Sequence, residues 1–169
     1  MFTLFRNTCL NILILSLCII AMPGEARADD YDSLKEGTVI RVNDGDTITV
    51  RHRLEEIRVR LFGIDAPERG QPGGLEAAEF LKDLVLSETV IIRTLYLDQY
   101  ERDVAIVAFP HGELLQDILL KAGHAWVYPT FCTIPRCAEW ERLENQAREK
   151  ALGLWAEDGA VAPWAWGVQ

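Results

Sequence analysis

The chain has 169 residues, with 17 Lys and Arg against 26 Asp and Glu, a formal net charge of −9. This length suits one domain with a single hydrophobic core. The negative charge excludes a protein that coats nucleic acid by bulk electrostatic attraction, because phosphates repel such a surface. It does not exclude an enzyme that concentrates positive charge in one small site.

The first 28 residues predict a cleaved secretory signal. Arg6 precedes an apolar run over residues 10–22, and a small-residue cleavage pattern ends at Ala28. The run is too short to cross a bilayer comfortably, so we expect a mature form that does not span the membrane. A lipoprotein anchored at Cys18 and an uncleaved anchor are the weaker alternatives. Removal of this segment leaves 141 residues with 15 basic and 25 acidic side chains, a net charge of −10. We expect an exported protein, either periplasmic or secreted.

Two cysteines, Cys132 and Cys137, remain after this removal. An even pair in an exported chain predicts a disulfide, which here would pin a short loop. A zinc site would need further ligands, and the three histidines of the chain stand at no ligand spacing.

The hydrophobic pattern after the polar lead at residues 29–36 predicts a small β-rich domain. Three strand-like runs come first, at residues 38–42, 47–51 and 57–61, and their short polar connections indicate an antiparallel meander. The remaining elements are a helix at 75–87, strands at 90–95 and 104–109, and helices at 113–122 and 137–151. Five short antiparallel strands usually close on themselves to avoid bare edges. We therefore expect a mainly β fold with α (α+β), a five-stranded barrel with three helices packed outside.

Acidic residues at two strand ends form the first candidate site. Asp65 and Glu68 follow the third strand, and Asp46 lies in the turn one strand earlier, so the meander can bring Asp46 and Asp65 together. Converging carboxylates repel unless a cation lies between them, and hard oxygen ligands suit Ca²⁺ or Mg²⁺. The alternatives are an ordinary hairpin turn around Asp46 and a solvated loop around Asp65 and Glu68.

Two arginines form the second clue. Arg60 lies on the third strand and Arg102 precedes the fifth, and guanidinium groups beside a carboxylate cluster can clamp a phosphate through paired hydrogen bonds. The alternative is that both arginines neutralise nearby acids.

Three motifs in a fixed order resemble those of the staphylococcal nuclease (thermonuclease) family. They are Gly45-Asp46-Thr47, Arg60-Leu61-Phe62-Gly63-Ile64-Asp65-Ala66-Pro67-Glu68, and Asp98-Gln99-Tyr100-Glu101-Arg102. The runs at 120–127 and 151–155 are also similar, and the resemblance extends over residues 37–156. It implies an oligonucleotide/oligosaccharide-binding (OB) barrel at 37–156, followed by a C-terminal tail at 157–169.

The resemblance also implies an activity, which is Ca²⁺-dependent hydrolysis of phosphodiester bonds in DNA and RNA that leaves 3′-phosphate ends. Asp46, Asp65 and the backbone carbonyl of Ala66 would hold the Ca²⁺, with Asp44 close to it through water. Glu68 would orient or deprotonate the attacking water, and Arg60 and Arg102 would grip the scissile phosphate. Such roles are physically sound, because preplaced cations stabilise the charge that develops on phosphate oxygens.

Aromatic side chains near these motifs suggest contacts to bases. We expect Tyr100 and Tyr128 to stack on substrate bases, whereas ordinary packing is at least as good an explanation for Tyr96 and Trp126. Glu101 departs from the family, which usually has glycine before the arginine. Because glycine permits a positive φ angle, we expect Glu101 to alter this loop and to place a negative charge beside the phosphate site.

The implied partner is a nucleic acid substrate, DNA and RNA alike, and we expect a monomer without a stable protein partner. The acidic charge predicts weak substrate affinity and a strong dependence on metal. The alternative functions are a non-catalytic barrel that binds nucleic acid or a protein, and a structural Ca²⁺ module. The combination of arginines, acids and Glu68 disfavours both.

Overall fold

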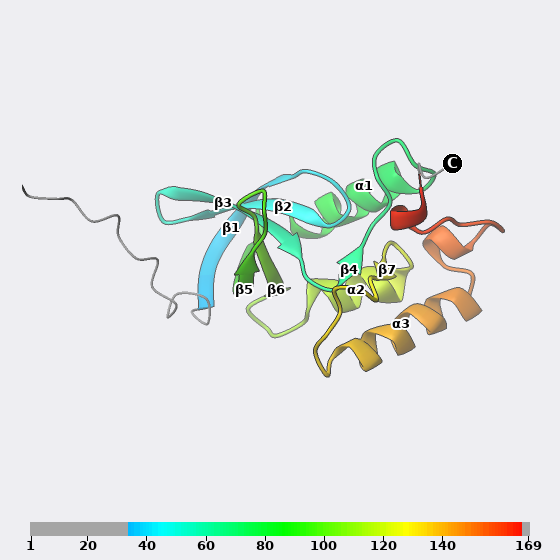
Figure 1. The fold of residues 1–169 in the computed structure, drawn as a ribbon. Helices are drawn as coiled ribbons and strands as arrows, with labels where there is room; N and C mark the ends of the chain where they lie inside the picture. The colour runs from blue at the N-terminus through cyan, green and yellow to red at the C-terminus, as the bar shows by residue number, and fades with distance from the viewer. Residues whose placement is uncertain (1–33, 167–169) are drawn as a thin grey trace, which may run out of the picture.

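The computed structural model describes residues 34–166, and its centre is a closed barrel of five strands (Figure 1). The expected signal at residues 1–28 lies outside the described residues. The barrel strands are β1 (Leu34–Val42), β2 (Thr47–His52), β3 (Glu55–Leu61), β5 (Thr89–Leu97) and β6 (Asp103–Ala108). The helices are α1 (Gly74–Val85), α2 (Leu115–Ala122) and α3 (Cys137–Glu149), with short 3₁₀ turns η2 (Gly153–Trp155) and η3 (Pro163–Ala165). The predicted α+β barrel is confirmed, and β1 begins earlier than the polar lead suggested.

The strand order around the barrel is β1-β2-β3-β6-β5, and β5 pairs with β1 to close it. The expectation that all five strands run antiparallel is wrong for one pair, because β3 and β6 are parallel. The reason is topological: a ring with an odd number of strands cannot alternate direction throughout. The crossover between these two strands contains α1 and β5.

The core fills the inside of the barrel with β-branched and leucine side chains. Its deeply buried strand residues include Val39, Ile48, Val50, Val59, Leu61, Ile92 and Val107. Outside the barrel, α2 and α3 pack together around Trp140, whose Nε1 donates a 2.7 Å hydrogen bond to Asp117. Leu75, which the sequence places on the apolar stripe of the first helix, is 57% exposed. It lies off the face of α1 that is actually buried, which carries Ala77, Ala78, Leu81 and Val85.

Two further short strands connect the barrel to the helices. They are β4 (Ile64–Asp65) and β7 (Trp126–Val127), neither of which was predicted. The two strands pair antiparallel and hold the Asp65 backbone against the α2–α3 region. The Cys132–Cys137 disulfide, as predicted, closes the loop before α3.

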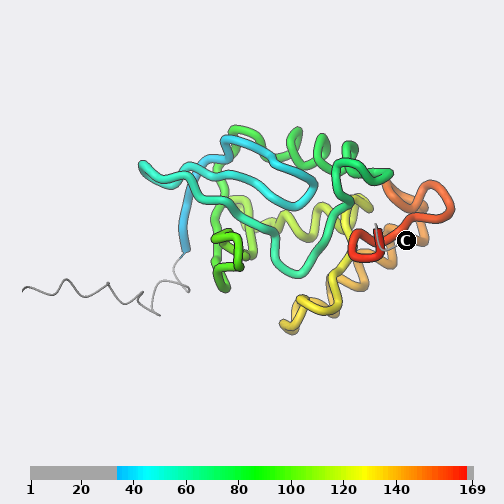
Figure 2. The backbone as a smooth tube through the Cα atoms, turned by 45° about the horizontal axis from the view of Figure 1, so that its top comes forward, coloured from blue at the N-terminus to red at the C-terminus, as the bar shows by residue number. Residues whose placement is uncertain are grey.

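The C-terminal segment folds back beside the segment that follows β4, as Figure 2 shows. Gln71 Nε2 donates a 2.5 Å hydrogen bond to the Val161 carbonyl, and the ring of Trp164 stacks on Tyr128 at 4.9 Å. None of the helices between residues 34 and 166 is both long enough and apolar enough to cross a bilayer.

Candidate active site

The β1–β2 loop places Asp46 at the centre of the candidate site. The loop is shaped by Asp44, whose Oδ1 accepts a 3.1 Å hydrogen bond from the Asp46 amide. A Cβ atom added at Gly45 would lie 2.6 Å from the Cβ of Ala66 and 2.9 Å from that of Ala77. Glycine is required here because the loop packs directly on α1 and on the chain after β4.

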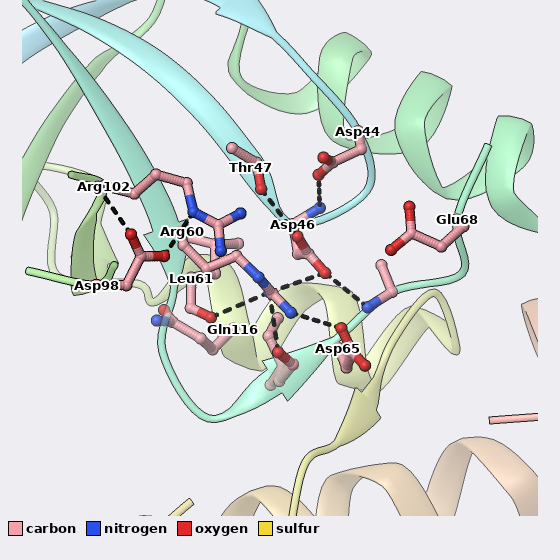
Figure 3. Close-up of polar contacts among 12 residues, drawn as sticks. Asp44, Asp46, Thr47, Arg60, Leu61, Asp65, Glu68, Asp98, Arg102 and Gln116 are labelled. Atoms are coloured by element: carbon pink, nitrogen blue, oxygen red, sulfur yellow. Dashed lines mark hydrogen bonds and ion pairs between the residues drawn. The ribbon is translucent and has the colours of Figure 1, made fainter. Parts of the chain in front are cut away.

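Asp46 is buried, at 5% exposure, and joins two distant segments of the chain. Its Oδ2 accepts a 2.8 Å hydrogen bond from the Ala66 amide and lies 2.8 Å from Nη1 of Arg60, while its Oδ1 accepts from the Thr47 hydroxyl at 3.0 Å. The juxtaposition of Asp46 with Asp65 expected from the meander is present, and Arg60 lies between them (Figure 3).

Arg60 extends from β3 and bridges both carboxylates. Its Nη2 donates a 2.5 Å hydrogen bond to Oδ1 of Asp65, and its Nη1 also donates to the carbonyl of Ile64 at 3.0 Å. Burial alone would lower the pKa of Arg60, but Asp46 and Asp65 hold the pKa of its guanidinium above the usual value. In this structure Arg60 therefore acts as a counter-ion of the acids.

The acids of this cluster have unusual protonation equilibria. Burial raises the pKa of Asp46 to about 8, with Asp44 and Asp65 adding to the effect and Arg60 opposing it. Burial also raises the pKa of Asp65 to about 6, with Arg60 opposing and Glu68 contributing. One guanidinium does not fully compensate this group of acids, so the cluster favours a further positive charge.

Arg102 approaches the same pocket from the loop before β6. Its Nε donates a 2.7 Å hydrogen bond to Asp98, and its guanidinium carbon lies 5.4 Å from the ring centroid of Tyr100. Burial opposes ionisation of Asp98, but hydrogen bonds from the backbone and side chain of Arg102 and from the Tyr100 amide hold its pKa below the usual value.

Glu68 differs from the other acids of the site because it is exposed. Its carboxylate faces the same space as Asp44 and Asp46 (Figure 3) and makes no hydrogen bond or ion pair with any of residues 34–166. Its backbone amide donates to the Gln71 side chain at 3.3 Å, which fixes the loop that carries it. A carboxylate in this state is available to a water molecule.

The structure brings the predicted site residues together in one pocket of about 160 Å³. Its lining comprises Asp44, Asp46, Thr47, Arg60, Asp65, Ala66, Pro67, Glu68 and Arg102. Within residues 34–166, however, no three His, Cys, Asp or Glu side chains are arranged as ligands of a metal ion. The pocket thus combines the candidate acids and arginines, with the arginines paired to acids.

A second pocket of about 460 Å³ adjoins the first and shares Arg60 and Arg102 with it. The aromatic residues that line it are Tyr96, Tyr100, Tyr128 and Phe131. The sequence had singled out the three tyrosines but missed Phe131, whose only signal was its position next to Cys132. Trp126 is buried at 4% exposure against Trp155, which makes it a packing residue.

A small closed barrel that gathers two arginines and four carboxylates in one pocket is the arrangement of an OB-fold enzyme acting on phosphodiesters. Comparison with known proteins gives the family. A model of the staphylococcal nuclease homologues matches residues 58–157, and the chain belongs to this family. The predicted resemblance to this family is thereby confirmed.

Individual relatives agree with this assignment. An uncharacterized endonuclease of Escherichia coli O157:H7 is 38% identical over 130 residues, which cover 77% of this chain and 83% of the relative. A micrococcal nuclease of Shigella flexneri is 37% identical over 138 residues, covering 77% and 79%. The staphylococcal-like nuclease CAN1 of Arabidopsis thaliana is 36% identical over 112 residues, covering 66% of this chain and 33% of the relative.

Proposed function

We propose that this nuclease-family protein hydrolyses phosphodiester bonds of DNA and RNA with the help of a bound Ca²⁺, leaves 3′-phosphate ends, and acts after export as a monomer. The observation that carries the proposal is the single pocket in which Arg60, Arg102 and the exposed Glu68 surround the Asp46–Asp65 pair. A protein that only binds nucleic acid has no need of an unpaired carboxylate beside two arginines.

The donor set of the pocket suits a hard cation. The carboxylates of Asp46 and Asp65 and the Ala66 carbonyl are oxygen donors of the kind Ca²⁺ prefers, and Asp44 is close enough to contribute through water. When bound, the ion supplies positive charge that stabilises the negative charge developing on the phosphate oxygens. Since Arg60 occupies oxygens of both aspartates in this structure, these contacts must loosen when a cation binds.

The arginines have a defined role in the proposal. A substrate phosphate can accept two hydrogen bonds from each guanidinium group. It would replace the carboxylates that now pair with Arg60 and Arg102. Two guanidinium groups on one phosphate both orient it and stabilise its transition-state charge. The side chain of Arg102 is 21% exposed, so its guanidinium group can reach a ligand without unfolding of the loop.

Glu68 is the group proposed to orient the attacking water or to accept its proton. It lies on the pocket wall, is exposed, and has no competing partner among residues 34–166. These are the conditions for a carboxylate that acts on water, because general-base catalysis requires hydrogen-bond access to the proton.

Digestion assays test the proposal. Plasmid, single-stranded DNA and RNA are incubated with the protein in Ca²⁺, in Mg²⁺ and in a chelator, and product ends are mapped by their sensitivity to phosphatase. We expect cleavage only with the cation, and Glu68→Gln should lower kcat by about 10²–10⁴-fold, the usual range for loss of a general base. Glu79→Gln, which changes an exposed acid on α1 outside the pocket, is the matched control.

Cleavage that persists in chelator, or a Glu68→Gln variant as active as the control, would contradict the mechanism. A protein that binds but cuts none of these substrates would favour the non-catalytic alternative.

The proposal of export is supported by the N-terminal pattern and by the Cys132–Cys137 disulfide, because disulfides persist in oxidising compartments. Mass spectrometry of the protein recovered from the periplasm and from the medium tests it. A mature N-terminus near residue 29 is expected, and an intact Met1 in a cytoplasmic fraction would contradict it.

A further inference from the structure

The outer face of β1, β2 and β3 carries a group of arginines that lies outside the candidate active site. Arg41 and Arg58 both pair with Thr49 of the central strand, so these three residues form one row across the sheet and point to the same side. Arg51 stands two residues beyond Thr49 on the same side, opposite Glu56. We call Arg41, Arg51 and Arg58 the arginine face.

The arginine face is exposed and only partly neutralised. The side chains of Arg41 and Arg51 are 60% and 57% exposed, and both approach one carboxylate, Glu56, at 3.9 and 3.5 Å. Such exposed pairs contribute little energy and separate easily. The side chain of Arg58 is exposed and makes no hydrogen bond or ion pair with any of residues 34–166. In a chain of net charge −9, this face concentrates three cations around one acid.

The face is continuous with the candidate active site. Arg60 follows Arg58 by two residues on β3, so it lies on the same side of the sheet, about 6.7 Å further along the strand. Its guanidinium enters the pocket that holds Asp46 and Glu68. On the other side of Arg60 and Arg102 lies the aromatic pocket of Tyr96, Tyr100, Tyr128 and Phe131.

We propose that the arginine face binds the sugar–phosphate backbone of a single nucleic-acid strand that continues from the cleavage pocket. The inference rests on the proposed function, because the strand is the substrate of that pocket. Charge complementarity selects the occupant: a polyanion is drawn to this face, whereas most of the protein's acidic surface repels it. The bases on the other side of the cleavage point meet the aromatic pocket, where stacking requires no particular sequence.

The arrangement explains how an acidic protein holds a polyanion. The proposed attraction follows one path across the β1–β2–β3 surface. Glu36, two residues before Thr38, borders that path at the end distant from the pocket. A short substrate that fills only the pocket gains nothing from the arginine face, whereas a longer strand does. Substrate length is therefore the variable that separates the face from the pocket.

Binding is measured in the full chain carrying Glu68→Gln, so that the ligand stays intact. Fluorescence anisotropy gives Kd for a single-stranded oligonucleotide of about 20 nucleotides, longer than the usual site of one OB fold, and competition gives Kd for a dinucleotide. The test variant combines Arg41→Gln and Arg58→Gln. The charge-matched control combines Arg142→Gln and Lys150→Gln, two exposed residues at and just after α3, on the side of the molecule away from the β2–β3 hairpin (Figure 1).

We expect the test variant to weaken binding of the long strand at least fivefold and the control to weaken it less than twofold, with dinucleotide binding unchanged in both. The slope of log Kd against log salt should fall by about 1.4 in the test variant, because a single strand releases about 0.7 counterions for each phosphate neutralised. Glu56→Gln, which removes the acid from the face, should strengthen binding of the long strand.

Equal losses in the test and control variants, or equal losses for long and short ligands, would overturn the inference. So would preferential binding of duplex DNA or of anionic vesicles to the face. The result remains separate from the proposed function: a wild-type chain that cuts nothing refutes catalysis, whereas the Kd values report on the face alone.

Discussion

Glu101 occupies a backbone conformation that normally favours glycine. Its φ angle is 59°, in the left-handed region, within a loop tied together by Asp98. Oδ1 of Asp98 accepts hydrogen bonds from the amides of Tyr100 and Arg102, and its own amide donates to the Arg102 carbonyl at 3.1 Å. The loop therefore keeps the left-handed turn that glycine would allow, and the expectation that Glu101 alters it is not met in the backbone.

Replacing Glu101 separates the backbone effect from the charge effect. A non-glycine residue in the left-handed conformation destabilises the fold by about 1–2 kcal/mol. Glycine removes this strain, but its larger conformational entropy in the unfolded chain offsets about 0.5–1 kcal/mol of the gain. We expect Glu101→Gly to raise the free energy of unfolding by about 0.5 kcal/mol, as measured by urea denaturation. Glu101→Ala keeps the strain, so its stability should match wild type.

Both substitutions should lower KM for single-stranded DNA, because both remove a negative charge beside Arg102. An alanine variant as stable as the glycine variant would show that backbone strain is not the cause.

At the same scale, the sequence placed Asp46, Asp65, Glu68 and the two arginines in one site through the order of the motifs. It left open whether the arginines face substrate or neutralise acids. The structure shows the second state, with Arg60 on Asp46 and Asp65 and Arg102 on Asp98. Such pairing depends on side-chain rotamers and burial, which no sequence spacing specifies. The catalytic roles of these residues stay predictions.

Close contacts between elements hold the site in place, and one of them is at Gly45. The β1–β2 loop lies against α1 and Ala66 with no room for a side chain. Gly45→Ala should lower the free energy of unfolding by about 1–3 kcal/mol, the cost of overpacking. Because Asp46 is the next residue, activity should fall more than stability predicts.

Gly70→Ala is the matched control for this substitution, since a Cβ atom there meets nothing within 4 Å. Thermal unfolding and kcat/KM are measured for both variants under saturating cation. Equal behaviour of the two variants would show that close packing at Gly45 does not position Asp46.

Element positions followed from periodicity wherever one face of the element is buried. The alternation of Ile48 and Val50 predicted β2, and Gly123 correctly marked the end of α2. The short strands β4 and β7 were not predicted, because each has two residues and so shows no periodicity. The parallel direction of the β3–β6 pair was not predicted for another reason. Local sequence indicates where a strand lies, but closure of the whole ring determines in which direction it runs relative to its neighbours.

At the scale of the whole molecule, His124 links stability to pH. It lies in a pocket of about 630 Å³ formed by α1, η2 and the C-terminal segment, stacked on Phe80. The charged residues that line this pocket with it are Glu76, Glu157 and Asp158. Burial lowers the pKa of His124 below 6.5, and Glu76 opposes the shift.

The sign of the effect follows from proton uptake. Below about pH 6.5 the unfolded chain binds a proton at His124 before the folded protein does, so acid lowers the free energy of unfolding until the folded-state pKa is reached. We expect His124→Gln to lose less stability than wild type between neutrality and about pH 5, measured by urea denaturation at each pH. Parallel losses in the two proteins would contradict this assignment.

The parallel pair β3 and β6 has a consequence for folding. Arg60 stands beside Val104 in this pair, and it is through this pairing that Arg60 and Arg102 come to share one pocket. The β1–β2–β3 meander can form from local contacts, but the pairing of β3 with β6 joins segments that α1 and β5 separate in the chain. We therefore expect a refolding chain to complete this candidate site only when the non-local β3–β6 pair forms.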